Sequence, residues 1–273
     1  MTRPDFIVAG ARRCGTTWLH RCLGEHPGIA LPTATKELFF FDRNWDRGTQ
    51  WYERYFETCP PGKITGEVSP SYFTAPEAPS RIHSTVPDAK LVFILRNPLE
   101  RVMSLYHHMR VSGDLTADLA EALITNAELI DEGFYARHLE RFRATFAPER
   151  IFVLLQEDAA QGGLAPLFGF LGVQPGFEPP SLHQRINERR EPRAPGPARA
   201  AVRLSRALHH SGLHRVVTAA KALGADRLFV RRRSLAKAGA PAGIADRVHA
   251  LYDDDTRQLG QMLGRDLKQV WDY

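Results

Sequence analysis

The chain has 273 residues, 43% of them hydrophobic, which is enough to bury the core of one large domain or of one domain with appendages. Its formal net charge of +5 and pI near 9.3 suit an anionic ligand, and its three cysteines form no Cys-x-x-Cys pair of the kind that binds zinc. With no signal peptide and no apolar stretch of about 20 residues, we expect a cytoplasmic protein without a transmembrane segment or a metal site.

The first predicted elements are a buried strand, a loop framed by glycines and a helix. Residues 6–9 form an apolar run typical of a parallel strand, and Gly10 and Gly15 frame the loop. From Trp18 the apolar positions recur at helical spacing. This order of elements directs backbone N–H groups and a helix dipole at an anion, so residues 10–17, here called the glycine loop, are a predicted anion-binding site.

The glycine loop departs from the Walker A pattern at one position. Thr16 follows Gly15, where a nucleoside triphosphatase carries the lysine that reaches the β- and γ-phosphates. Positive charge lies upstream instead, at Arg12 and Arg13. A tight turn between strand and helix, with basic surface residues, is the alternative interpretation of this stretch.

A single acidic residue precedes an aromatic run in residues 36–42. Glu37 stands before Phe39, Phe40 and Phe41, and the pattern allows two interpretations. The carboxylate is either a surface charge beside a buried edge or a general base at the wall of an apolar pocket. Residues 45–56, with aromatic residues among charges, are predicted to form a short amphipathic helix.

Residues 64–73 form a second predicted strand that enters a turn, and residues 89–95 form the most strongly predicted strand of the chain. The apolar run of residues 89–95 predicts a central strand of a parallel sheet. Arg96 follows the end of this strand. Ligands of open α/β sheets lie beyond such strand ends. Ser104 follows on the next predicted helix, about two turns along, and would support the same anion. A salt-bridging Arg96 and a solvated Ser104 are the alternative.

Later segments continue the alternation of helices and strands. Residues 116–146 are predicted to be helical, 151–158 a buried strand, and 164–171 a short helix, which together indicate an α/β fold with a mainly parallel sheet. Residues 174–200 are rich in proline and arginine and are predicted to be a loop, 198–237 a basic amphipathic helix, and 245–270 the last helix. We expect one domain over 1–273, with about 174–240 as a basic loop and helical insertion or cap.

Four segments, in the same order, resemble the 3′-phosphoadenosine 5′-phosphosulfate (PAPS)-dependent sulfotransferases. Residues 10–19 resemble the 5′-phosphosulfate loop of that family, and residues 94–106 its 3′-phosphate motif. Residues 36–42 and 67–73 resemble the base-bearing segment and the next strand and turn of the heparan sulfate branch. The resemblance covers most of the chain except about 195–240, and it implies a P-loop NTPase-like sheet flanked by helices, with a C-terminal helical and loop extension, as in soluble bacterial members.

The resemblance also implies a function: in-line transfer of a sulfuryl group from PAPS to a hydroxyl or amine of a carbohydrate or small metabolite. The product nucleotide would be 3′-phosphoadenosine 5′-phosphate (PAP), with no metal and no nucleic-acid partner. By the resemblance, the catalytic residues are Glu37 as general base, with Arg13 and His108. The residues implied in nucleotide binding are Arg12, Arg13, Cys14, Gly15, Thr16, Thr17, Trp18, Arg96, Ser104, Tyr135, Arg185, Asn187 and Arg190.

This sequence departs from the family pattern at two positions. Arg13 occupies the loop position that usually holds a catalytic lysine, and Val68 stands where some relatives carry a second one. Arginine can stabilise charge on a leaving oxygen, but its pKa forbids acid catalysis near neutral pH. A P-loop kinase and a basic protein that binds sulfated glycans or nucleic acid without turnover remain the alternative functions. The pattern leaves the acceptor and the oligomeric state open.

Overall fold

The computed structural model describes residues 3–184, 190–192, 230–232 and 243–272. The chain forms two compact units. Unit 1 comprises Met1–Arg101, Asp131–Ile186 and Asp246–Tyr273, and unit 2 comprises Val102–Ile130 and Asn187–Ala245. The expectation of a single domain with a cap stays a prediction.

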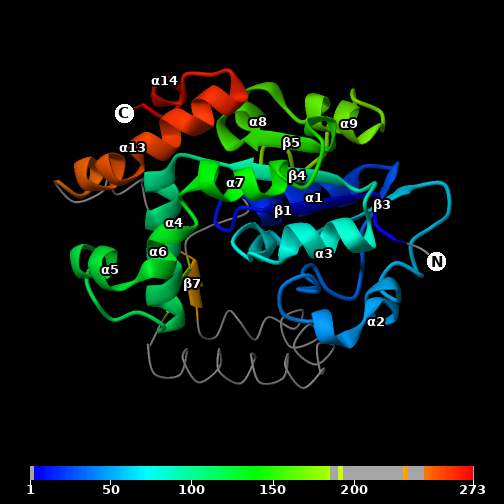
Figure 1. The fold of residues 1–273 in the computed structure, drawn as a ribbon, viewed down its shortest axis with the longest axis horizontal. Coiled ribbons are helices and arrows are strands. Elements are labelled where there is room, and N and C mark those ends of the chain that lie inside the picture. Colours follow the sequence, from blue (N-terminus) through cyan, green and yellow to red (C-terminus); the bar gives the residue numbers. More distant parts are fainter. Residues whose placement is uncertain (1–2, 185–189, 193–229, 233–242, 273) are drawn as a thin grey trace. The chain divides into compact units, whose positions relative to one another are not determined.

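Unit 1 is built on a five-stranded, all-parallel sheet with the strand order β2-β3-β1-β4-β5 (Figure 1). The predicted α/β fold with a central parallel sheet is therefore confirmed. The strands β1 and β4 each have a neighbour on both sides, as the apolar run of residues 89–95 predicted for β4. The strands are β1 Phe6–Gly10, β2 Ile29–Ala30, β3 Ile64–Val68, β4 Lys90–Leu95 and β5 Ile151–Leu155.

The strand β1 forms the centre of the core because its two faces are both covered. Every residue from Phe6 to Ala9 has no exposed surface. The ring of Phe6 packs on β3 at Gly66, where a Cβ atom would lie 2.1 Å from the ring. Glycine in this strand therefore marks a close approach of an aromatic ring to the backbone.

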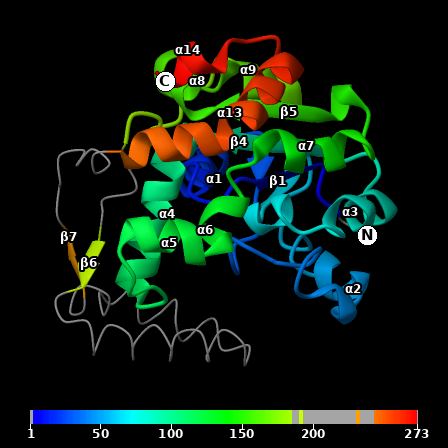
Figure 2. The ribbon, with the colours of Figure 1, turned by 60° about the vertical axis from the view of Figure 1, so that its left-hand side comes forward.

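Helices cover both faces of this sheet. Figures 1 and 2 show α3 and α7 on one side and α1 on the other. The ring of Phe142 in α7 packs on Phe93 of β4, with centroids 4.8 Å apart. The helices of this unit are α1 Thr16–Glu25, α2 Thr49–Glu53, α3 Ala78–Thr85, α7 Tyr135–Arg143, α8 Gln156–Gly162, α9 Ala165–Leu171, α13 Ile244–Leu263 and α14 Leu267–Trp271; short 3-10 turns are η1 Trp45–Arg47, η2 Pro70–Phe73 and η3 Pro148–Arg150.

Two predicted helices are shorter than their hydrophobic patterns indicated. The predicted helix over 45–56 is only η1 and α2, which are separated at Gly48. The predicted last helix over 245–270 breaks into α13 and α14. Gly264 takes a left-handed φ of 65°, and the Asp266 carboxylate then accepts the N–H groups that begin α14. Apolar periodicity continues through this break, so it did not reveal the break.

Unit 2 contains most of α4 Pro98–Ser112, which enters it at Val102, together with α5 Leu119–Thr125 and α6 Ala127–Asp131. It also contains an antiparallel pair, β6 Arg190–Pro192 with β7 Val230–Arg232. The predicted helix over 198–237 is therefore wrong at 230–232, because backbone pairing with a distant segment overrides local periodicity. The rest of that prediction lies outside the described residues. No helix in the described part of the chain is both long and apolar enough to span a bilayer.

Candidate active site

The glycine loop leaves the sheet at its switch point. It follows β1, whose neighbours β3 and β4 belong to opposite halves of the strand order. At Gly10 a Cβ atom would lie 2.6 Å from the Cβ of Phe73, and the Ala11 N–H donates to the Ile94 carbonyl at 2.9 Å. In open α/β sheets the crevice at this point is where ligands bind.

The loop ends at the N-terminus of α1 in a conformation that leaves the helix end without a side-chain cap. Gly15 is the N-cap residue, has a left-handed φ of 98° and offers no side chain to the first N–H groups. The helix begins with the bond from the Leu19 N–H to the Gly15 carbonyl, 2.9 Å long. Such an end presents backbone N–H groups and a positive dipole to an anion, the geometry that the sequence predicted.

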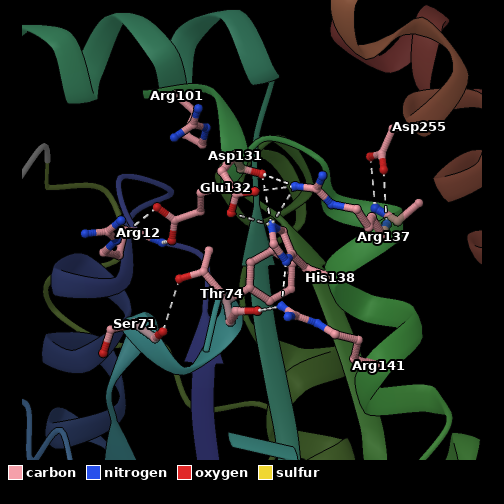
Figure 3. A network of polar contacts seen from close by, with 12 residues as sticks. Arg12, Ser71, Thr74, Arg101, Asp131, Glu132, Arg137, His138, Arg141 and Asp255 are labelled. Atoms are coloured by element: carbon pink, nitrogen blue, oxygen red, sulfur yellow. Dashed lines mark hydrogen bonds and ion pairs between the residues drawn. The ribbon is translucent and has the colours of Figure 1, made fainter. Parts of the chain in front are cut away.

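Arg12 is bound by a buried carboxylate that sequence reasoning missed. The carboxylate of Glu132, fully buried just before α7, accepts the Arg12 main-chain N–H at 2.7 Å and the Arg12 Nε at 3.0 Å (Figure 3). Burial raises the pKa of Glu132, and the charge of Arg12 opposes that shift. A lone glutamate 120 residues from the loop carries no local signal of this partnership.

Arg13 and Arg96 meet at the other side of the loop. Arg13 has a left-handed φ of 67°, and its carbonyl accepts from Arg96 Nη1 at 3.2 Å. Burial, and then the charge of Arg96, lower the pKa of Arg13. Arg96 forms an ion pair with Glu100 through Nη2, while its buried Nε has no hydrogen-bond partner among the residues that the structure describes. Two of the predicted site arginines are therefore adjacent.

Cys14 and Tyr135 form a buried support beneath the loop. The Cys14 Sγ lies 3.4 Å from the Tyr135 hydroxyl, which donates to the Arg96 carbonyl at 3.1 Å. Burial raises the pKa of the Cys14 thiol to about 11, so it is protonated at neutral pH and a poor nucleophile. With 1% exposure, Tyr135 links α7 to the loop and to the end of β4.

The structure brings Lys36 and Glu37 to the glycine loop. Lys36 Nζ lies 3.2 Å from Thr17 Oγ1, 3.4 Å from Thr16 Oγ1 and 3.0 Å from Glu37 Oε1. The Glu37 side chain is 29% exposed, so its carboxylate is open to solvent. Sequence reasoning left Lys36 out of the predicted site. One sequence feature could have indicated Lys36: residues 10–17 contain no lysine, and the first lysine of the chain is next to Glu37.

A buried polar cluster holds the segment that carries this pair. The Leu38 N–H donates to Ser69 Oγ at 3.1 Å, and the Phe40 N–H donates to the Tyr72 hydroxyl at 2.8 Å. Tyr72 in turn donates to the buried Glu67 carboxylate at 2.5 Å, and burial raises the pKa of Glu67. The segment 38–40 is therefore tied at two backbone positions to the strand-and-turn segment 67–73.

A polar network centred on His138 lies behind the loop (Figure 3). The His138 Nδ1 accepts from Arg141 Nη2 at 2.6 Å, and Nε2 donates to the Asp131 carbonyl at 2.9 Å. These partners assign the neutral tautomer with its proton on Nε2. Burial lowers the pKa of His138 to about 4, so the ring is uncharged at neutral pH.

The remaining predicted site residues lie on other elements or outside the described residues. Trp18 donates through Nε1 to the carbonyls of Ser181 and Leu182, each at 3.1 Å, and so ties α1 to the segment that precedes residue 185. Ser104 and His108 lie on α4 within unit 2. Arg185 and Asn187 lie outside the described residues, and Arg190 is described only as part of β6. Their predicted roles stay predictions.

Comparisons with known proteins identify related sequences and folds. The sulfotransferase domain family matches residues 3–174. Heparan sulfate glucosamine 3-O-sulfotransferase 6 of Mus musculus is 41% identical over 103 residues, which are 38% of this chain and 30% of that protein. Bifunctional heparan sulfate N-deacetylase/N-sulfotransferase 4 of Mus musculus is 33% identical over 201 residues, 64% of this chain and 23% of that protein. The chain thus matches less than a third of the length of either relative.

A solved structure shares the fold over its whole length. The crystal structure of a sulfotransferase from Alicyclobacillus acidocaldarius superposes with a TM-score of 0.73, covers 100% of both chains and is 23% identical in sequence. At this identity the likeness concerns the fold.

Proposed function

This chain belongs to the sulfotransferase domain family, and from that premise we propose that it transfers a sulfuryl group from PAPS to a hydroxyl or amine. The acceptor oxygen or nitrogen forms a bond to sulfur, and the sulfur–oxygen bond to the 5′-phosphate breaks with its electron pair left on the phosphate. The acceptor proton passes to Glu37. Because the bond that breaks is already activated in PAPS, we expect the protein to accelerate the reaction mainly by positioning the reactants and stabilising the charge that develops.

The observation that carries this proposal is the contact chain from the glycine loop to Glu37. One ammonium, that of Lys36, touches the Thr17 hydroxyl at the loop and the Glu37 carboxylate at 3.0 Å. A general base has to lie within hydrogen-bond reach of an acceptor that itself reaches the donor. The accessible carboxylate of Glu37 beside the glycine loop supports this role.

The residues at the loop fit a PAPS molecule. The uncapped end of α1 and the hydroxyls of Thr16 and Thr17 suit its 5′-phosphosulfate, which supplies the activated sulfuryl group when bound. Arg96 suits its 3′-phosphate, because its buried Nε lacks a partner among the described residues and a guanidinium binds phosphate through two N–H groups. A phosphate oxygen would satisfy this nitrogen.

We propose a carbohydrate or a small hydroxylated metabolite as the acceptor. Support comes from two relatives that are named for action on heparan sulfate, a carbohydrate. An acceptor with a free hydroxyl or amine is the chemical requirement that Glu37 imposes.

Calorimetric binding of PAP, 5′-AMP and ATP in the presence of EDTA tests the proposal directly. We expect micromolar binding of PAP alone, because only PAP carries both a 5′- and a 3′-phosphate. Preference for ATP, or dependence on Mg²⁺, would favour the kinase alternative instead. Binding that weakens steeply with salt and shows no selectivity would favour a non-enzymatic binder.

Glu37→Gln tests the assignment of the base. The variant keeps the shape of the side chain but cannot accept a proton at neutral pH, so we expect turnover to fall by at least 100-fold, the typical contribution of a general base. PAP affinity should stay within a few-fold of wild type. Near-normal turnover would remove Glu37 from this role.

A further inference from the structure

We propose that Lys36 supplies the lysine ammonium that the glycine loop lacks and, beside the loop's own Arg12 and Arg13, binds the 5′ phosphate end of the nucleotide at the N-terminus of α1. The inference rests on the proposed function, because it assumes a nucleotide with a 5′-anion at this loop. It names a donor-binding residue that lies 20 residues beyond Thr16, on a different segment.

The first support is the direction in which the ammonium donates. An ammonium has three N–H groups, and Lys36 Nζ has three oxygen partners: two threonine hydroxyls of the loop and the carboxylate of Glu37. Hydroxyls are neutral acceptors, whereas a phosphate oxygen carries negative charge and adds a Coulomb attraction to the ammonium. An anion at the loop would therefore replace the hydroxyls as the preferred partner.

The second support is electrostatic. The N-terminus of a helix carries a partial positive charge, so a cation there is unfavourable when no anion is present. The side chains of Thr16 and Thr17 lie in the first turn of α1, and Lys36 contacts both. A positive side chain held against a positive helix end is the arrangement expected of a binding site for a multiply charged anion.

His20 lies on α1 within range of the charge of Lys36. His20 follows Thr16 by one turn on α1, and its pKa is lowered to about 4, first by burial and then by the positive charge of Lys36. The contacts of Lys36 Nζ with Thr16 Oγ1 and Thr17 Oγ1 place the ammonium at the first turn of the helix. Its side chain is 23% exposed, so a ligand can still reach it.

Two other basic residues of the loop region, like Lys36, are paired with carboxylates. Arg12 Nε donates to the buried Glu132, and Arg96 pairs with Glu100 and with the Arg13 carbonyl. Arg96 is thus placed for the 3′-phosphate of the nucleotide, and Lys36 for the 5′ end. Each cation would therefore bind a different phosphate of the nucleotide.

The test measures how much affinity the 5′-phosphate contributes. For each protein, calorimetry gives the Kd of PAP and of adenosine 3′-phosphate, which lacks the 5′ group; their ratio is the contribution of the 5′-phosphate. In Lys36→Met, which keeps the length of the side chain without its charge, we expect this ratio to fall at least tenfold. The Kd of adenosine 3′-phosphate should stay within about twofold of wild type.

Two further variants serve as controls. Lys36→Arg keeps the charge and should retain most of the ratio. Lys63→Met makes the same chemical change at an exposed lysine immediately before β3, at the amino edge of the parallel sheet, and should leave the ratio unchanged. Equal melting temperatures for the three variants would show that each one folds.

The outcomes separate this inference from the proposed function. An unchanged ratio in Lys36→Met, or parallel losses for both nucleotides, would overturn the role of Lys36 while the PAP site stands. A wild-type protein that binds PAP no better than 5′-AMP and ATP would overturn both. A selective loss of the 5′ contribution supports Lys36 as the ammonium that the loop lacks.

Discussion

The carboxylate of Glu132 accepts both the main-chain N–H and the side-chain Nε of Arg12, at 2.7 and 3.0 Å, although 120 residues separate the two in sequence. The contact fixes the backbone of the glycine loop from a position before α7. A loop that presents N–H groups to an anion must hold them in place before the ligand arrives, and Glu132 contributes to that preorganisation.

Glu132→Ala should lower the free energy of unfolding by about 3 kcal/mol, because it leaves a main-chain N–H and a partly buried guanidinium without their acceptor. Urea unfolding at pH 7 measures this loss. Glu149→Ala, at an exposed glutamate of η3, is the matched control and should change stability by less than about 0.5 kcal/mol. Similar losses in the two variants would contradict the anchoring role.

Arg96→Ala should weaken PAP binding by about 2 kcal/mol, roughly 30-fold, because a charge-assisted contact to the 3′-phosphate is lost. Affinity for 5′-AMP, which lacks that phosphate, should change much less. Calorimetry with both nucleotides makes the comparison. Equal PAP affinity in the variant and the wild type would refute the assignment of Arg96.

His138 should make the protein less stable as the pH falls from about 6.5 to about 4. Its pKa is about 4 in the folded state, lowered chiefly by burial, against about 6.5 in an unfolded chain. Between these pKa values the unfolded state binds a proton that the folded state does not. The free energy of unfolding therefore decreases as the pH is lowered through this window, and the contribution of His138 is complete above pH 6.5. The total contribution is on the order of 3 kcal/mol.

Urea unfolding at pH 7 and pH 5 measures this dependence. The wild type should lose more stability between the two values than His138→Gln, which has no proton to bind there. An equal loss in both proteins would mean that other groups carry the pH dependence.

Gly66→Ala should destabilise the fold by about 3 kcal/mol, because the new methyl group would lie 2.1 Å from the ring of Phe6 at a buried position of β3. Gly176→Ala, where a Cβ atom meets no other heavy atom within 4 Å, is the control and should be nearly neutral. Chemical denaturation of both variants provides the comparison. A neutral Gly66→Ala would mean that Phe6 moves aside at little cost.

Local patterns in the sequence were sufficient for the α/β fold and for the place of the glycine loop. The apolar runs of the predicted strands 6–9 and 89–95 require cover on both faces, so they predicted buried parallel strands. Gly10 and Gly15 indicated the loop because both positions require glycine. The backbone at Gly10 packs closely against Phe73, and Gly15 has a left-handed φ. The family resemblance was confirmed by the match over residues 3–174.

Only the tertiary structure decided which charges meet at the loop. Glu132 reaches Arg12 across 120 residues, and Lys36 reaches Thr16 and Thr17 because segment 38–40 is tied to Ser69 and Tyr72. Hydrophobic periodicity records which face of an element is buried, but it carries no information on which distant side chains share that environment. Ion pairs and hydrogen bonds over long sequence separations depend on how the packed elements place them, and this is why Lys36 and Glu132 emerged from the structure.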